Sequence, residues 1–216
     1  MLRAVIFDWD GVVVDSSRHH ERSWEIIAGR HGLPLPPDHF KRGFGKKNNI
    51  IIPDLGWAHE PDAVDALARE KEEIYRSLVR EEGIEPLPGI RELLASLNAG
   101  GIPCAIGSST ERANLDALLD LMDVRRFYSA IVSGEEVEHG KPDPSIFLLA
   151  AQRLDVAPSE CIVIEDAQVG IEAAHRAGMR VAAIATTHPL GELGVADKAF
   201  ASTADLTVDA LRSVLA

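Results

Sequence analysis

Two carboxylates one residue apart, Asp8 and Asp10, follow an apolar run at residues 4–7, close to the start of the sequence. Such a run predicts a buried strand, and the catalytic groups of open α/β sheets gather outside the carboxyl ends of the strands. Because neighbouring carboxylates repel one another unless a cation or a shared proton intervenes, a hard divalent metal ion is their natural partner. The alternative is a strand end that is merely solvated.

A second apolar run, at residues 103–107, leads into the hydroxyls of Ser108, Ser109 and Thr110. Because Gly107 has no side chain, the backbone amides near it can approach an anionic oxygen closely. The alternative is that these hydroxyls only cap a helix that begins near residue 111. The segment therefore predicts either an anion contact or a helix start.

Three further polar groups, Lys141, Glu165 and Asp166, occur in two later segments. Lys141 precedes Pro142, and a proline restrains the residue before it, which can hold an ammonium group in place. Glu165 and Asp166 follow an apolar run and precede an expected helix. Considered alone, this acidic pair could serve only to complement the helix dipole.

The order of these segments resembles the four sequence motifs of the haloacid dehalogenase-like phosphohydrolases. The patterns acid-x-acid-Gly, strand-Ser-Ser, Gly-Lys-Pro and Glu-Asp occur in that order and extend over nearly the whole chain. Within this superfamily the chain is similar to the branch that contains beta-phosphoglucomutases and small phosphosugar phosphatases.

The resemblance implies a role for each of these residues. Asp8 would be the nucleophile that forms an aspartyl-phosphate, and Asp10 would protonate the leaving oxygen and then activate water or a hydroxyl. Ser108 and Lys141 would hold the transferring phosphoryl group, with Ser109 in the same substrate-binding segment. The cofactor would be Mg²⁺, and its ligands would be Asp8, the Asp10 backbone carbonyl, Glu165 and Asp166.

The order of the expected elements predicts an α/β fold with an inserted all-helical cap. Strands alternate with helices along most of the chain, and they are expected near residues 3–8, 103–107, 128–132, 161–165, 180–185 and 199–201. Right-handed crossovers would arrange them as a doubly wound, parallel, Rossmann-like sheet. We expect a catalytic core at residues 1–14 and 87–216 and a helical cap at residues 15–86, hinged so that it excludes water and selects the substrate.

Three residues of the expected cap are candidate substrate contacts. Lys71 lies on an otherwise apolar helix face together with Tyr75, and it either extends to solvent along its apolar stem or contacts the substrate. The resemblance favours the contact, because this branch has a lysine followed four residues later by a tyrosine at this point. His20 shares a helix face with Trp24, and the pair is either packed in the cap or faces the active site, as in the family.

The loop at residues 41–48 is basic and glycine-rich, and it could meet a second phosphate or a sugar ring through Lys47 and Asn48. A solvated loop is the alternative. Mutases of this branch usually have an arginine three residues after the loop glycine, where this chain has Asn48 after Gly45. Lys47 lacks the bidentate fork of arginine, so this departure weakens the mutase interpretation more than the phosphatase one. Trp9, which lies between the two acids, is a second departure and has no interpretation.

Composition excludes several classes of partner. A net charge of −12 over 216 residues disfavours binding to nucleic acid or to an anionic membrane. No run approaches the roughly 20 apolar residues of a membrane span, and the N-terminal run is interrupted by acids, unlike a secretory signal. We expect Cys104 and Cys161 to be reduced thiols in the core. Because thiols stay reduced in the cytosol, we also expect a cytoplasmic protein. We expect a monomer whose partner is a small phosphorylated metabolite.

Three functions fit these residues. The favoured one is a Mg²⁺-dependent phosphatase that hydrolyses a small phosphorylated metabolite, above all a sugar phosphate. The alternative is a phosphoglucomutase-type enzyme, in which a sugar hydroxyl instead of water accepts the phosphoryl group from Asp8. The third is a catalytically silent phosphate-binding module, which the presence of every acid and base disfavours. A related possibility, phosphonate cleavage, would use Lys71 as a Schiff-base nucleophile.

Overall fold

The computed structural model describes residues 1–43 and 46–215. The chain divides into two compact units. The first, here called the core unit, consists of Met1–Asp15 and Glu85–Ala216, and the second, here called the cap unit, consists of Ser16–Ile84. That these units act as catalytic core and substrate-selecting cap stays a prediction.

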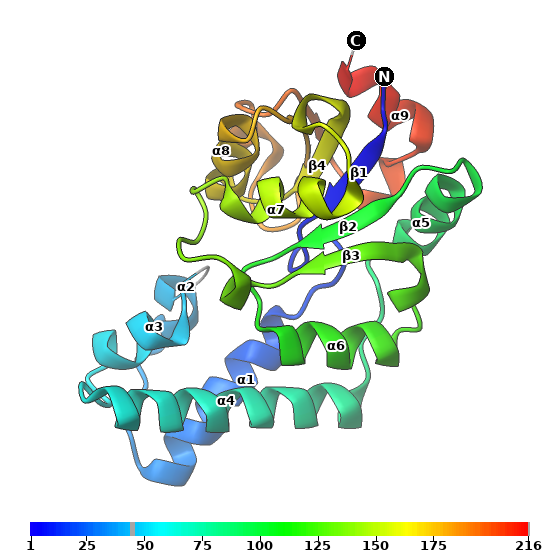
Figure 1. The fold of residues 1–216 in the computed structure, drawn as a ribbon. Helices are drawn as coiled ribbons and strands as arrows, with labels where there is room; N and C mark the ends of the chain where they lie inside the picture. Colours follow the sequence, from blue (N-terminus) through cyan, green and yellow to red (C-terminus); the bar gives the residue numbers. More distant parts are fainter. Residues whose placement is uncertain (44–45, 216) are drawn as a thin grey trace. The chain divides into compact units, whose positions relative to one another are not determined.

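A parallel sheet lies at the centre of the core unit (Figure 1). Within the described residues it has six strands in the order β3-β2-β1-β4-β5-β6. The strands are β1 (Ala4–Phe7), β2 (Cys104–Gly107), β3 (Tyr128–Val132), β4 (Cys161–Glu165), β5 (Arg180–Ile184) and β6 (Lys198–Phe200). The central strands β1, β2 and β4 are buried along their whole length, which explains their continuous apolar sequences. The predicted doubly wound, Rossmann-like sheet is confirmed.

Helices cover both faces of this sheet. On one face, Phe147 of α7 and Ile171 of α8 pack with Ala4 and Ile6 of β1. On the other side of the sheet, α5 contacts β2 and α9. The helices of the core unit are α5 (Ile90–Ala99), α6 (Arg112–Leu121), α7 (Ser145–Leu154), α8 (Gln168–Arg176) and α9 (Val208–Arg212).

Parallel pairing brings the carboxyl ends of the strands to one edge of the sheet. Phe7 of β1 is in register with Ile106 of β2 and with Ile164 of β4. The next residue along β1 is Asp8, and the next along β4 is Glu165. The register therefore places the acids that follow β1 beside those at the end of β4.

The cap unit is helical, as predicted for this part of the chain. Its helices are α1 (Ser17–His31), α2 (His39–Gly43), α3 (Asn48–Asp54) and α4 (Pro61–Glu82). α1 and α3 both pack against α4, and Trp24, Ile27, Ile52 and Ile74 contribute to their shared apolar core. α4 begins at Pro61, because the fixed φ of proline suits the first helical turn.

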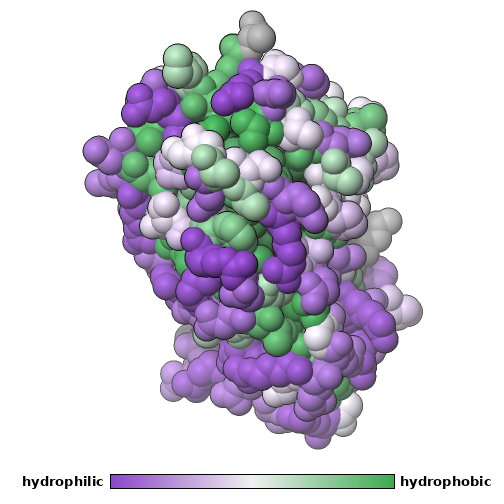
Figure 2. Space-filling view, turned by 90° about the vertical axis from the view of Figure 1, so that its right-hand side faces the viewer, coloured by the Kyte–Doolittle hydropathy of each residue, from purple (hydrophilic) through white to green (hydrophobic). Residues whose placement is uncertain are grey.

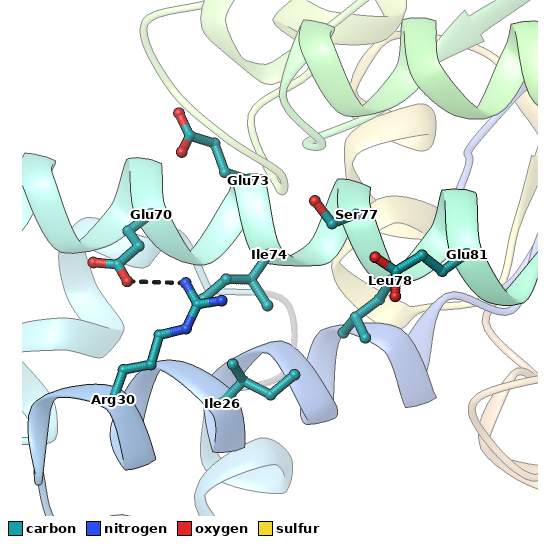
Figure 3. A pocket seen from close by; sticks show the side chains of 8 residues that line it. All are labelled: Ile26, Arg30, Glu70, Glu73, Ile74, Ser77, Leu78 and Glu81. Atoms are coloured by element: carbon teal, nitrogen blue, oxygen red, sulfur yellow. Dashed lines mark hydrogen bonds and ion pairs between the residues drawn. The ribbon is translucent and has the colours of Figure 1, made fainter.

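A groove lies between α1 and α4 of the cap unit (Figure 3). Ile26 of α1 and Ile74 and Leu78 of α4 point toward one another, while the Arg30 guanidinium lies 3.3 Å from a carboxylate oxygen of Glu70. None of the predicted site residues lines this groove. We therefore assign it to the packing of two amphipathic helices.

Charged residues make up 26% of the sequence, and hydrophilic side chains cover much of the face shown in Figure 2. Among the residues that the structure describes, no helix has both the length and the apolar composition needed to span a membrane.

Candidate active site

Asp8 lies directly after β1, and its side chain is held by a buried lysine. Lys141 Nζ donates to Asp8 Oδ1 at 2.7 Å and to Glu165 Oε1 at 2.6 Å. The Lys141 ammonium also lies 4.8 Å from the centre of the Phe147 ring, and its side chain is only 7% exposed. One ammonium group thus fixes two carboxylates that come from different strands.

A cluster of three buried acids surrounds this lysine contact. Asp8, Glu165 and Asp166 each contribute a carboxylate oxygen, and these oxygens lie within 4.8 Å of one another. Glu165 Oε2 accepts the backbone N–H groups of Asp166 at 2.8 Å and Ala167 at 2.9 Å. Such a set of hard oxygen donors is the kind that divalent cations bind.

The charges of the cluster do not balance when all three acids are ionised. Burial, assisted by Glu165, raises the pKa of Asp8 to about 7 despite the nearby Lys141 ammonium. Burial and the charges of Glu165 and Asp8 raise the pKa of Asp166 to about 8. Burial opposes the charge on Lys141, but the carboxylates of Asp8 and Glu165 raise its pKa above the usual value. Three acids face the single ammonium group of Lys141. A divalent cation therefore fits this donor set, because it would relieve the repulsion among the carboxylates.

These shifts predict how the stability of the metal-free protein depends on pH. A carboxyl group whose pKa is raised in the folded state stabilises the fold while it keeps its proton, and this contribution is lost as the pH rises through the folded-state pKa. The folded-state pKa is about 7 for Asp8 and about 8 for Asp166, so this stability continues to be lost up to these pH values. The free energy of unfolding of chelator-treated protein should therefore fall by on the order of 2 kcal/mol between pH 6.5 and 8.

Urea unfolding at the two pH values measures this difference. Addition of a divalent cation at pH 8 should restore the lost stability, because the bound ion replaces the protons of the two acids. Equal stability of the metal-free protein at both pH values would contradict the assignment of raised pKa values to these acids.

Asp10 and Ser108 are joined through Thr110. The Thr110 hydroxyl donates to Asp10 Oδ2, and the Thr110 backbone N–H donates to Ser108 Oγ at 3.1 Å. Ser108 is buried and Ser109 is exposed. Gly11, which follows Asp10, adopts a φ of +77°, a conformation that glycine allows at little cost. The turn after β1 therefore directs the Asp10 carboxylate toward the segment that follows β2.

Trp9, between the two acids, is part of the interior. Its side chain is fully buried. The indole N–H makes no hydrogen bond within residues 1–43 and 46–215. The structure therefore gives Trp9 a packing role.

Contacts to the predicted residues come from three positions that sequence reasoning missed. The Thr187 hydroxyl donates to Asp166 Oδ2, and His188 Nδ1 lies 3.2 Å from the Asp166 carbonyl oxygen. At Gly170, a Cβ atom would come within 1.7 Å of Glu165 Oε1, so only glycine leaves room for that carboxylate. Thr187 and His188 lie shortly after β5, so the rule that identified Asp8 and Asp166 from strand ends could have found them.

The predicted cap residues form a second polar cluster, entirely within the cap unit. Lys71 Nζ lies 2.7 Å from His20 Nδ1 and 5.2 Å from the centre of a Trp24 ring. His20 stacks on Tyr75 with ring centres 3.9 Å apart. Lys71 is only 2% exposed, so the alternative in which it extends into solvent is wrong.

The segment at residues 41–48 lies partly outside the described residues, which omit 44 and 45 and hence the loop glycine. Lys47 is exposed and precedes α3. Asn48, the first residue of α3, donates from Nδ2 to Glu72 Oε1 at 2.7 Å. The same Glu72 oxygen accepts from Lys71 Nζ at 2.8 Å, so Asn48 is linked through Glu72 to the polar cluster of the cap unit.

Comparison with known proteins identifies the family of this chain. The family model described as haloacid dehalogenase-like hydrolase matches residues 2–178. The chain is 38% identical over 196 residues to the chloroplastic 5-amino-6-(5-phospho-D-ribitylamino)uracil phosphatase of Arabidopsis thaliana, covering 89% of this chain but only 52% of that relative. It therefore spans about half the length of that protein.

Two further similarities cover most of both chains. The chain is 37% identical over 176 residues to the fructose-1-phosphate phosphatase YqaB of Escherichia coli (strain K12), covering 81% of this chain and 92% of the relative. A crystal structure of beta-phosphoglucomutase from Clostridium difficile matches with a TM-score of 0.86 and 27% identity, over 100% of this chain and 97% of that one. The chain belongs to the haloacid dehalogenase-like hydrolases, in the branch of the beta-phosphoglucomutases and phosphosugar phosphatases.

Proposed function

We propose that this protein is a Mg²⁺-dependent phosphatase that hydrolyses a small phosphorylated metabolite, a sugar or polyol phosphate, through an aspartyl-phosphate on Asp8. The observation that carries the proposal is the hydrogen bond from Lys141 to Asp8, close to the carboxylates of Glu165 and Asp166 at the end of β4. A nucleophilic carboxylate needs positive charge beside it before it can approach an anionic phosphate. Lys141 supplies one such charge.

The reaction has two steps. In the first, an Asp8 oxygen forms a bond to phosphorus while the bond from phosphorus to the leaving oxygen breaks, and Asp10 gives its proton to that oxygen. In the second, Asp10 takes a proton from a water molecule that attacks phosphorus, the bond to Asp8 breaks, and inorganic phosphate leaves. The hydrogen bond from Thr110 orients Asp10 for both proton transfers, and Ser108 and Lys141 hold the phosphoryl oxygens.

The proposed Mg²⁺ site consists of Asp8, Asp166, Glu165 and the Asp10 backbone carbonyl. When bound there, the ion supplies positive charge that screens the nucleophile and the phosphoryl group from one another. Because both Glu165 oxygens already accept hydrogen bonds, we expect Asp8 and Asp166 to contribute most of the affinity for the ion.

Replacement of Thr187 by valine should weaken Mg²⁺ binding by about 10-fold to 100-fold. Thr187→Val keeps the shape of the side chain but removes the hydroxyl that orients Asp166 Oδ2. Isothermal titration of Mg²⁺ into metal-free protein measures the affinity without reference to turnover. Thr186→Val, one position earlier in the same loop, is the matched control, and an equal effect of both substitutions would contradict the positioning role.

A mutase is the second candidate, because the chain matches a beta-phosphoglucomutase structure over its whole length. The two activities differ in whether water or a sugar hydroxyl accepts the phosphoryl group. In this chain Asn48 stands where mutases of the branch usually have arginine, and its amide is bonded to Glu72. Such an arrangement favours a phosphatase, because arginine provides the bidentate phosphate contact that an asparagine cannot.

A panel of phosphorylated metabolites tests the proposal. It should include fructose 1-phosphate, a phosphorylated hexitol, p-nitrophenyl phosphate, and beta-glucose 1-phosphate with a trace of the 1,6-bisphosphate. Free phosphate and glucose 6-phosphate are followed together, with and without Mg²⁺. Rapid Mg²⁺-dependent phosphate release is the expected result. Formation of glucose 6-phosphate with little free phosphate would identify a mutase, and no reaction with any member would favour a silent phosphate-binding module.

The remaining expectations concern partners and setting. That the protein is a cytoplasmic monomer that binds neither nucleic acid nor membrane stays a prediction.

A further inference from the structure

The loop after β2, which carries Ser108 and Thr110, lies against the turn that follows β3. The Ser108 backbone N–H donates to the Val132 carbonyl oxygen at 3.1 Å, and the Gly134 backbone N–H donates to the Thr110 carbonyl oxygen at 3.2 Å. At Gly134, which is buried, a Cβ atom would lie 2.4 Å from the Ser109 carbonyl oxygen. Because a real Cβ atom does not approach backbone so closely, only glycine lets the two segments meet at this distance.

Two acidic side chains fix this turn in place. Glu135 Oε2 accepts from the Arg112 backbone N–H at 2.7 Å, which ties the turn to the first residue of α6. Glu136 Oε1 accepts from the Ser133 backbone N–H at 2.9 Å, and the other Glu136 oxygen accepts from the Arg153 guanidinium of α7. The turn is thus anchored to two helices of the core unit.

Thr110 connects this turn to the chemistry of the site. Its hydroxyl donates to Asp10 Oδ2, and in the proposed function Asp10 gives its proton to the leaving oxygen. A general acid must lie within hydrogen-bond reach of the atom that it protonates, and a displacement of about 1 Å can cost on the order of 10²-fold in rate. A shift of the loop after β2 would therefore move the hydroxyl that orients Asp10.

We propose that Gly134 and Glu135 are positioning residues for the general acid, because they hold Thr110 where its hydroxyl directs Asp10 toward the leaving oxygen. This inference rests on the proposed function, and it adds two residues beyond the groups that hold phosphate and metal. Its consequence depends on the leaving group. A sugar or polyol alkoxide must take a proton as it leaves, whereas p-nitrophenolate leaves as a stable anion and needs little help from Asp10.

The replacement Gly134→Ala tests the proposal, because the added Cβ displaces Ser109. The measured quantity is kcat/KM for the sugar or polyol phosphate that is hydrolysed fastest, divided by kcat/KM for p-nitrophenyl phosphate. kcat/KM includes only the steps up to the departure of the leaving group. Any change at Ser108, which holds the phosphoryl group of both substrates, cancels in this ratio. In Gly134→Ala the ratio should fall by about 10-fold to 100-fold.

Two further variants show whether the effect passes through Thr110. Thr110→Val, which removes the hydroxyl that donates to Asp10, should lower the ratio by a similar factor. The double variant should lower it little further, because both substitutions act through one contact. Gly100→Ala is the matched control: the nearest atom to a Cβ there is 3.4 Å away, an ordinary contact, and Gly100 precedes β2, at the opposite end of that strand from the site. Its ratio should equal that of the wild type.

Equal losses with the two substrates in Gly134→Ala would overturn the proposal, because they would show a structural role only. A double variant in which the two losses multiply would do the same. If thermal unfolding shows that Gly134→Ala does not fold, Glu135→Ala decides in its place. It removes an exposed side chain and should lower the ratio, and an unchanged ratio would overturn the proposal. Failure of the proposed function gives a different result, because the wild-type enzyme would then release phosphate from neither substrate.

Discussion

The Asp8→Asn variant should lose phosphatase activity by on the order of 10³-fold or more while its fold remains intact. An asparagine oxygen can still accept the hydrogen bond that Lys141 donates to Asp8 Oδ1 at 2.7 Å. The amide is, however, far too weak a nucleophile to form a covalent intermediate at phosphorus. The substitution therefore removes the chemistry with little change in packing.

Phosphate release from p-nitrophenyl phosphate at saturating Mg²⁺ measures the loss, and thermal unfolding verifies the fold. Asp209→Asn is the matched control, because Asp209 is an exposed acid of α9 in the same unit and its replacement should leave turnover unchanged. Purified Asp8→Asn protein that retained most of its phosphate release would show that Asp8 is not the nucleophile.

The sheet was predictable because its strands are short, buried and parallel. Buried parallel strands have continuous apolar sequences, and those that became β1, β2 and β4 are followed directly by polar residues. Since parallel strands end at one edge, the rule that catalytic groups lie beyond strand ends could be applied without knowledge of the register. It identified Asp8, Ser108 and Asp166 for this reason.

The contacts that orient these groups were harder to predict, even where the residue lies near a strand end. The hydroxyl of Thr187 reaches Asp166 from a loop 21 positions later in the sequence, and a threonine near a strand end has many ordinary uses. Similarly, the sequence left Lys71 with two interpretations, extension to solvent or a substrate contact, because a long aliphatic stem allows either. Its contacts with Glu72 and His20 exclude the first, and the second stays a prediction. Side-chain pairing of this kind depends on tertiary distances that periodicity does not encode.

Replacement of Lys141 by methionine should reduce kcat/KM by on the order of 10²-fold to 10³-fold and should also destabilise the metal-free protein. Methionine can keep the apolar stem packed near the Phe147 ring, from which the ammonium lies 4.8 Å, but it donates no hydrogen bond. The acids at Asp8 and Glu165 then lose the positive charge between them. Removal of one partner from a buried ion pair costs about 3–5 kcal/mol.

The two effects should respond differently to Mg²⁺, and this difference separates a catalytic role of Lys141 from a structural one. Bound Mg²⁺ should restore much of the stability, because it supplies positive charge to the same acids. It should restore little activity, because the proposed contact of Lys141 with the phosphoryl oxygens is absent at any metal concentration. Lys198→Met is the matched control: Lys198 also lies near a phenylalanine ring, 5.5 Å from the centre of Phe200, but it is exposed and distant in sequence from the acids. Full recovery of Lys141→Met turnover at high Mg²⁺ would mean that this lysine only balances charge and that the ion alone carries the electrostatic part of catalysis.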